Sequence, residues 1–222
     1  MGGDGFLHRY FLNNGDKQLH KWVHYFDIYE RHFERFRGKK PVMIEIGVQG
    51  GGSLAMWKAY FGEGCRIVGI DIDPACKNHE SEDIEVFIGD QSDPEVINRI
   101  LAKYPKIDIV LDDGSHLSPN MIGSFNLLYG RISPNGVYAV EDTHANYWSD
   151  WGGGLRKDDT FMEYSKNKID ELNACHTRGA LPPTDFTACT DSMTFYDSVV
   201  VFEKRPQGFR QAPITGGMNN PR

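Results

Sequence analysis

The sequence predicts an α/β protein built on a doubly wound sheet of seven strands, most of them parallel. From residue 41 onward, short apolar runs alternate with helix-compatible segments, which is the order of a parallel sheet covered by helices. The first run leads into a glycine-rich turn. Near the end of the chain, two apolar runs flank Asp197-Ser198, which predicts an antiparallel hairpin. We therefore expect a Rossmann-like sheet that ends in a terminal antiparallel hairpin.

Each element is predicted from its periodicity. Continuous runs rich in Val and Ile indicate buried strands, whereas apolar residues spaced by three and four indicate helices. Pro94 is placed to open one of these helices. The expected strands are 42–46, 66–70, 85–88, 107–111 and 136–140, followed by hairpin strands at 193–196 and 199–203. The expected helices are 54–61, 94–104, one carrying Met121, Phe125 and Leu128, and 160–175.

An aromatic segment precedes the sheet. Between residues 17 and 37, apolar side chains recur at helical spacing with charged residues between them, which predicts one amphipathic helix. This helix would either form the interface of a homodimer or higher homo-oligomer, or cover a cofactor. We expect a helical extension at 1–40, a single catalytic domain at 41–205 and a flexible tail at 206–222, which is rich in Pro, Gly and Asn.

Composition excludes several classes of function. The net charge of −7 argues against a protein that binds the phosphate backbone of nucleic acids. The chain has no basic segment followed by a long apolar one, and no apolar run reaches the length that spans a bilayer. We expect a soluble, cytoplasmic protein with neither a nucleic-acid nor a membrane partner.

The glycine-rich turn favours one kind of cofactor. Its glycines, Gly47, Gly50 and Gly51, allow the backbone to approach a ligand closely, but they miss the GxGxxG spacing of dinucleotide sites. Glu45 precedes the turn, and its carboxylate would repel a pyrophosphate but attract a sulfonium ion and an amino group. We therefore expect S-adenosylmethionine, bound in part by Glu45, this turn and Ser53.

The next two strand ends extend the expected cofactor site. Asp71 ends the second strand, where a carboxylate can accept hydrogen bonds from both ribose hydroxyls. Asp73 should point to the other side and cap the turn at Pro74. At the end of the third strand, either Asp90 or Gln91 would meet the adenine amine, although Asp90 could also be only a turn residue.

Two acidic clusters follow the fourth and fifth strands. Asp112 and Asp113 are consecutive, so the pleat directs them to opposite faces, and we assign Asp113 to a metal ion and Asp112 to the cofactor side. Glu141 and Asp142 both reach the ion if the strand end loosens. Three carboxylates without a cation would repel one another, and oxygen ligands suit Mg²⁺ or another divalent ion.

Two histidines stand next to these acids. His116 follows Asp113 on the same loop and is the expected general base for a hydroxyl, and His144 is the competing candidate. Tyr147, Trp148 and Trp151 come next, and their faces suit either a sugar surface or ordinary packing.

The pair Asp113-Gly114-Ser115-His116 and Glu141-Asp142 resembles the metal-dependent sugar O-methyltransferases of macrolide biosynthesis, such as the mycinamicin and macrocin O-methyltransferases. Cephalosporin hydroxylase-like proteins share much of the same pattern. The resemblance covers roughly residues 17–204, and the strand order resembles the class I S-adenosylmethionine-dependent methyltransferase fold. It implies that the three acids bind Mg²⁺, that the histidine is the base, and that the enzyme is oligomeric.

The sequence thus predicts a Mg²⁺-dependent O-methyltransferase that acts on a hydroxyl of a sugar, glycoside or oligosaccharide. A second hypothesis keeps the cofactor and the metal but uses a catechol-like phenolic acceptor. A third is an NAD-dependent oxidoreductase, against which the glycine spacing and Glu45 count. A fourth is a binding module without catalysis.

Overall fold

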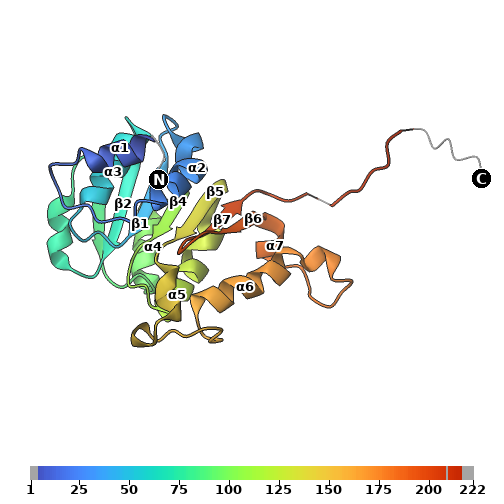
Figure 1. The fold of residues 1–222 in the computed structure, drawn as a ribbon. Helices are drawn as coiled ribbons and strands as arrows, with labels where there is room; N and C mark the ends of the chain where they lie inside the picture. The colour runs from blue at the N-terminus through green and yellow to red at the C-terminus, as the bar shows by residue number, and fades with distance from the viewer. Residues whose placement is uncertain (1–4, 209, 217–222) are drawn as a thin grey trace, which may run out of the picture.

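A mixed seven-stranded sheet forms the centre of the protein. The structure, a computed structural model, describes residues 5–208 and 210–216. The strand order is β3-β2-β1-β4-β5-β7-β6, in which β7 runs antiparallel to both β5 and β6 and the other neighbouring strands are parallel (Figure 1). This arrangement confirms the predicted fold class. The strands are β1 (Val42–Ile46), β2 (Arg66–Asp71), β3 (Ile84–Ile88), β4 (Ile107–Asp112), β5 (Ile132–Val140), β6 (Thr190–Phe195) and β7 (Val200–Lys204).

Helices cover both faces of the sheet. In Figure 1, α1 and α3 lie on one side of the strands, and α5 and α6 lie on the other. The first face carries α1 (Phe6–Leu12), α2 (Tyr25–Phe33) and α3 (Gly52–Phe61), and the second carries α4 (Pro94–Lys103), α5 (Ser118–Leu128), α6 (Phe161–Leu172) and α7 (Asp185–Cys189). Short 3₁₀ turns are η1 (Glu34–Phe36), η2 (Pro74–His79), η3 (Tyr129–Arg131), η4 (Thr143–Tyr147), η5 (Ser149–Trp151) and η6 (Ala174–His176).

The strand pleat separates two hydrophobic cores. In β1, Met43 packs among the aromatic side chains of α2 and α3, whereas Ile44 packs on the opposite face with α4 and α5. The same alternation continues through β4 and β5. Consequently, the odd-numbered residues toward the carboxyl ends of these three strands face α2 and α3. Among the described residues, no helix is both long and apolar enough to cross a membrane.

The N-terminal region differs from the prediction. The expected helix at 17–37 begins only at Tyr25, and residues 17–22 instead form an irregular segment, here called the N-terminal strap. The N–H of Gly52 donates a hydrogen bond to the carbonyl of Gln18 (3.0 Å), so the strap lies against the glycine turn. Tertiary contacts therefore override the helical periodicity here. The short helices α1 and α7 were not predicted.

The predicted domain boundaries stay predictions. Leu7 of α1 and Phe26 of α2 share one core with β1, so these two helices pack directly on the sheet. The tail predicted to be flexible, 206–222, includes residues 209 and 217–222, which lie outside the described residues.

A polar contact fixes α2 on the sheet. The Nδ1 atom of His32 lies 2.6 Å from the carboxylate of Glu203 on β7, and the Arg35 guanidinium donates to the same carboxylate. The Tyr196 hydroxyl lies 2.9 Å from the other ring nitrogen of His32. Burial alone would raise the pKa of Glu203, but hydrogen bonds from His32 and Arg35 outweigh it and hold the pKa below its usual value.

Replacing Glu203 by Gln should destabilise the protein by about 1–2 kcal/mol at pH 7, because charged hydrogen bonds are lost. A carboxylate with a depressed pKa contributes stability above its unfolded pKa of about 4.3 and loses it as the pH falls through the folded pKa. The difference from wild type should therefore disappear in acid, as measured by urea unfolding from pH 7 to pH 3. Glu34→Gln, at an exposed ion pair with Arg37, is the control and should change stability by less than about 0.5 kcal/mol. An equal effect of both substitutions would contradict this account.

Candidate functional site

A cavity of about 360 Å³ opens at the carboxyl edge of the sheet, between the N-terminal strap and the glycine turn. In parallel α/β sheets this edge is where ligands bind, and the turn after β1 lies next to β4, where the strand order reverses. The cavity brings together expected cofactor, metal and base residues. Its lining includes Gln18, Leu19, His20, Lys21, Gly47, Val48, Gln49, Gly50, Ser53, Asp71, Asp73, Cys76, Asp113, Gly114, His116, Glu141 and Asp142.

A second cavity of about 320 Å³ adjoins the first. The two share Gly47, Asp71 and Gly114, so they form one elongated site with a common wall. The second cavity is the more apolar of the two and contains the expected adenine-side residues Asp90 and Gln91.

The glycine turn is held by Asp71. One carboxylate oxygen of Asp71 accepts hydrogen bonds from the N–H groups of Val48 (2.8 Å) and Gln49 (3.1 Å), and the other accepts from Asp73 (2.9 Å). Burial would raise the pKa of Asp71, but these backbone donors outweigh it and lower the pKa. As predicted, Asp73 caps η2 by accepting a hydrogen bond from Ala75.

No side chain would fit at Gly47 or Gly51 without overlapping a neighbouring residue. Gly47 has φ +90°, and a Cβ there would overlap the carbonyl oxygen of Asp113. Gly51 has φ +72° and caps α3, and a Cβ there would overlap the ring of His79. Gly50 lies against Gln18 of the strap. The glycines thus let the turn pass close to the strap and to the loop that follows β4, here called the β4 loop.

Several expected cofactor residues lie behind the cavities rather than in them. Glu45 is fully buried and accepts a hydrogen bond from the Ser53 hydroxyl (2.8 Å). Asp112 is also fully buried, on the opposite face from Asp113 as the pleat predicted, and it accepts hydrogen bonds from Ser124 and Gln91. Burial raises the pKa of Asp112 to about 6.

Gln91 and Asp90 also support the loops. The amide nitrogen of Gln91 donates to Asp112 (3.0 Å), and its amide oxygen accepts from the N–H of Ser115 (2.9 Å). Asp90 accepts hydrogen bonds from the N–H and hydroxyl of Ser92, which is the turn role that the sequence left open. Gln91 thereby joins the ends of β3 and β4.

Three carboxylates lie on one face of three neighbouring strands. Glu45 pairs with Leu111 in the register between β1 and β4, and Asp112 pairs with Val140 in the register between β4 and β5. Odd-numbered residues therefore share a face, and Glu45, Asp113 and Glu141 all point toward α2 and α3. Glu141 is fully buried, and burial and the charge of Asp113 raise its pKa despite a neighbouring ammonium group.

That ammonium group belongs to Lys21 of the strap, which the sequence analysis did not assign to the site. Its Nζ atom donates to the carboxylates of Asp113 and Glu141 (3.1 Å to Oε1 of Glu141) and lies 3.5 Å from Oε1 of Glu45. Desolvation lowers the pKa of Lys21, but the three negative charges outweigh it and hold the pKa well above its usual value. Nothing local in the sequence marks Lys21, because it meets the acids only in the fold.

Glu141 and Asp142 diverge because Asp142 leaves the strand conformation. Asp142 has φ +51° and ψ +33°, so the expected loosening of the strand end occurs at this residue. Glu141 accepts a hydrogen bond from the Tyr29 hydroxyl, and Asp142 accepts one from the Tyr25 hydroxyl (2.6 Å). Two tyrosines one turn apart on α2 thus hold the two acids, and both acids line the cavity.

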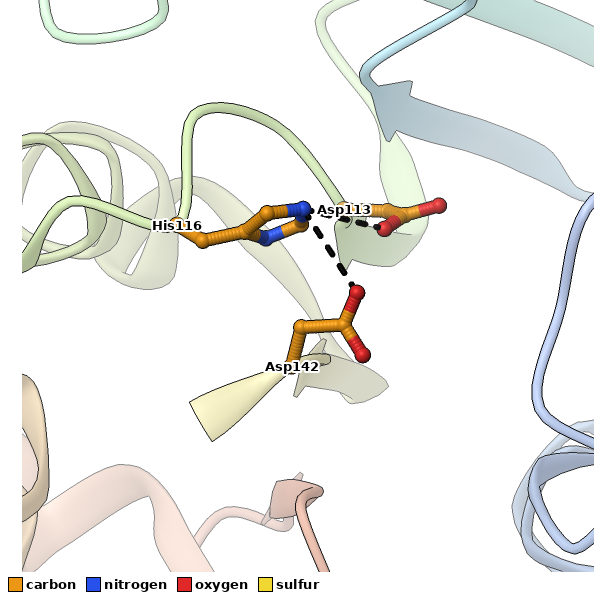
Figure 2. Close-up of side chains that lie close together, drawn as sticks. All are labelled: Asp113, His116 and Asp142. Atoms are coloured by element: carbon orange, nitrogen blue, oxygen red, sulfur yellow. Dashed lines mark ion pairs between the residues drawn. The ribbon is translucent and has the colours of Figure 1, made fainter. Parts of the chain in front are cut away.

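His116 completes the cluster from the β4 loop. Figure 2 shows its Nε2 atom directed at both aspartates, 3.5 Å from Oδ2 of Asp142 and 3.9 Å from Oδ1 of Asp113. One ligand atom from each of Asp113, His116 and Asp142 lies within 4.8 Å of the others. The carboxylate oxygens of Asp113 and Asp142 suit a divalent cation, and the imidazole of His116 lies beside them. Glu141, the third predicted metal ligand, lies outside this group of close ligand atoms.

His144 lies beside the cluster and not in the cavity lining. Its Nδ1 atom is hydrogen-bonded to the Ser198 hydroxyl in the β6–β7 turn and lies 3.8 Å from Asp142. The exposed side chains of Trp22 and Trp148 flank its ring, with centroids 5.9 Å and 4.6 Å away. Trp151 lies 5.9 Å from the ring of His116. We call Trp22, Trp148 and Trp151 the aromatic rim.

Gly47→Ala should destabilise the protein by about 3 kcal/mol and weaken binding at the cavity, because the new Cβ overlaps the β4 loop in a strained backbone conformation. Gly152→Ala is the control, since Gly152 has φ +72° and ψ +9° with open space around it, and should cost about 1 kcal/mol. Urea unfolding of both variants measures the difference. Equal losses would show that strain, and not the close approach to Asp113, sets the need for glycine at position 47.

Comparisons with known proteins identify relatives of this chain. The chain is 36% identical over 199 residues to an 8-demethyl-8-alpha-L-rhamnosyl tetracenomycin-C 2'-O-methyltransferase of Streptomyces olivaceus, a match that covers 83% of this chain and 52% of the relative. It is 37% identical over 166 residues to demethylmacrocin O-methyltransferase of Streptomyces fradiae, covering 68% and 41%. The chain thus spans about half the length of these curated relatives, or less. No family model matches it.

The solved structures similar to this chain are also methyltransferases. The MycE methyltransferase from the mycinamycin biosynthetic pathway, in complex with Mg, SAH and mycinamycin VI, superposes with a TM-score of 0.78 at 31% identity, covering 89% of this chain and 52% of that one. The O-methyltransferase TomG from Streptomyces achromogenes, in complex with SAM, superposes with a TM-score of 0.55 at 15% identity over 90% of this chain and 86% of that one, which shows the fold alone. The chain is therefore a homologue of sugar O-methyltransferases and has their methyltransferase fold, which confirms the resemblance predicted from its DGSH and Glu-Asp motifs.

Proposed function

We propose that the protein transfers the methyl group of S-adenosylmethionine to a hydroxyl of a sugar or glycoside, with the help of Mg²⁺ or another divalent ion. The observation that carries the proposal is the convergence of Asp113, His116 and Asp142 in a cavity that also contains the glycine turn. The relatives' names support this reaction, since they include a rhamnosyl and a macrocin O-methyltransferase. They favour a sugar over a phenolic acceptor, and methyl transfer over hydride transfer.

The adjoining cavities suit the two halves of the cofactor. The methionine end would lie in the first cavity, near the turn from Gly47 to Gly51 and near Ser53, and the adenine would lie in the more apolar second one. Asp71 borders both, in the position for a ribose. Both ends of the Gln91 amide are engaged, which favours Asp90 as the partner of the adenine amine. Glu45 and Asp112 would not touch the cofactor. They would orient two residues of the cavity lining through hydrogen bonds, Glu45 orienting Ser53 and Asp112 orienting Gln91.

Asp113, Glu141 and Asp142 would hold the divalent ion. When bound, the ion would polarise an acceptor hydroxyl and so lower the cost of removing its proton. Tyr25 and Tyr29 orient Asp142 and Glu141 through hydrogen bonds from their hydroxyls. The two tyrosines thus hold the carboxylates in a fixed orientation from the α2 side of the site.

His116 is the base in this proposal. The acceptor oxygen attacks the sulfonium methyl carbon, the sulfur–methyl bond breaks with its electrons passing to sulfur, and the hydroxyl proton moves to Nε2 of His116. That nitrogen faces the two aspartates, which stabilise the imidazolium that forms. His144 is less suited because Ser198 engages its Nδ1 atom and its ring lies outside the cavity lining.

The aromatic rim is the proposed platform for the acceptor. Its side chains are 39–54% exposed although they lie beside the two histidines. Flat aromatic faces pack against the C–H surface of a pyranose while its hydroxyls stay available to polar groups. The arrangement supports a sugar presented edge-on to His116.

Methyl transfer from labelled S-adenosylmethionine, with rhamnosides, other glycosides and catechol as acceptors, tests the proposed function. We expect labelled sugar ethers, formed only with a divalent ion, and loss of product in chelator. His116→Ala should lower kcat by about 10²–10⁴-fold, while the affinity for S-adenosylhomocysteine stays within a factor of about two. His144→Ala should retain most activity. Normal turnover of the His116→Ala variant, or methylation of catechol alone, would contradict the proposal.

Trp151→Ala should raise the KM for the sugar acceptor about tenfold and leave the affinity for S-adenosylhomocysteine unchanged, because only the acceptor loses a stacking surface. Ile169→Ala, which removes an exposed apolar side chain from α6, is the control and should change neither quantity. Steady-state kinetics with varied acceptor, together with calorimetric titration of the cofactor product, separates the two. An unchanged KM in the Trp151→Ala variant would show that the aromatic rim does not form part of the acceptor site.

A further inference from the structure

The strap places a cation inside the acid cluster. The side chain of Lys21 is 2% exposed, and its ammonium group contacts Asp113, Glu141 and Glu45, which come from three neighbouring strand ends. A fully buried lysine is rare unless it is paired, and here three carboxylates surround it. Sequence motifs account for the acids but give Lys21 no role.

We propose that Lys21 is an internal cation that neutralises the acid cluster when no divalent ion is bound, and that it sets the affinity for that ion by competing for Asp113 and Glu141. The proposal rests on the proposed function only in that the cluster binds a divalent ion. It adds a positioning residue that tunes this binding.

The shared ligands are the first argument. Lys21 donates to Oδ2 of Asp113, and Oδ1 of the same carboxylate faces His116, on the side where Asp142 also lies. Glu141 is bonded to Lys21 through both carboxylate oxygens, at 3.1 and 3.2 Å. An ion held by Asp113 and Glu141 would therefore use carboxylates that the ammonium group already holds.

Charge gives the second argument. One ammonium group does not balance Glu45, Asp113, Glu141 and Asp142, so the cluster retains an attraction for a further cation. A divalent ion at the same carboxylates would, however, stand within a few ångströms of the buried ammonium group, in a region of low dielectric. Removing the Lys21 charge should therefore strengthen ion binding and also leave buried carboxylates without a partner.

The third argument is that the strap is built to hold Lys21 in place. The hydrogen bond from Gly52 to Gln18 anchors the strap on the glycine turn, and Tyr25 begins α2 directly after it. Residues 17–22 depart from the expected helix, and this departure directs Lys21 into the cluster. A lysine that served only solubility would face solvent.

Lys21→Met tests the proposal, because it removes the charge and keeps most of the apolar stem. Calorimetric titration with MgCl₂, without cofactor or acceptor, should give a dissociation constant at least tenfold lower than that of the wild type. Thermal unfolding in chelator should show a lower Tm for this variant, and excess Mg²⁺ should restore it. The Tm of the wild type should depend much less on Mg²⁺. Lys17→Met removes a charge from the same strap outside the cavity lining, and it should behave as the wild type does.

A double variant, Lys21→Met with Glu45→Gln, covers the case in which the single variant does not fold, because it removes one of the carboxylates left unpaired. It too should bind Mg²⁺ more tightly than the wild type. Unchanged or weaker Mg²⁺ binding in the folded variants overturns the proposal. Failure of both variants to fold even in saturating Mg²⁺ also overturns it, since the ion then does not take the place of Lys21. If neither the wild type nor any variant binds a divalent ion, the metal part of the proposed function fails as well.

Discussion

Three carboxylates at adjacent strand ends, two fully buried and one half-buried, need positive charge, and much of the site is arranged around this need. Glu45, Asp113 and Glu141 share a face because the parallel order β1-β4-β5 brings odd-numbered residues of three strands together. Lys21 supplies one charge, and hydroxyl groups from α2 supply neutral donors. The contact between α2 and Glu203 on β7 then holds that helix on the sheet, so the polar cluster and the docking of α2 depend on each other.

The sequence predicted those features that local pattern determines. Runs of Val and Ile marked the parallel strands, and the pleat separated Asp112 from Asp113 before any contact was known. The DGSH and Glu-Asp motifs follow strands whose carboxyl ends meet at one edge, so their convergence needed only the strand order. The glycine turn was recognisable for the same reason, because its spacing is local.

Features that depend on distant contacts were not predictable in this way. The helical period from residue 17 onward is real, yet the strap leaves it because Lys21 and Gln18 find partners that are far away in sequence. Asp142 adopts positive φ, and the pattern that marked β5 gave no signal of this change. His144 was an equal neighbour of the acids in sequence, but Ser198 of the β6–β7 turn draws it aside. In each case a long-range partner, and not propensity, decided the outcome.

The position of the aromatic rim has a consequence for how such enzymes diversify. Trp22 belongs to the strap, and Trp148 and Trp151 lie at the two ends of the short η5 region, whereas Asp113 and Glu141 are tied to the strand ends of the rigid sheet. Exposed loop positions tolerate insertion and exchange better than strand ends do. Under the proposed function, acceptor preference can therefore change, by natural drift or by loop grafting, while the proposed reacting groups keep their geometry.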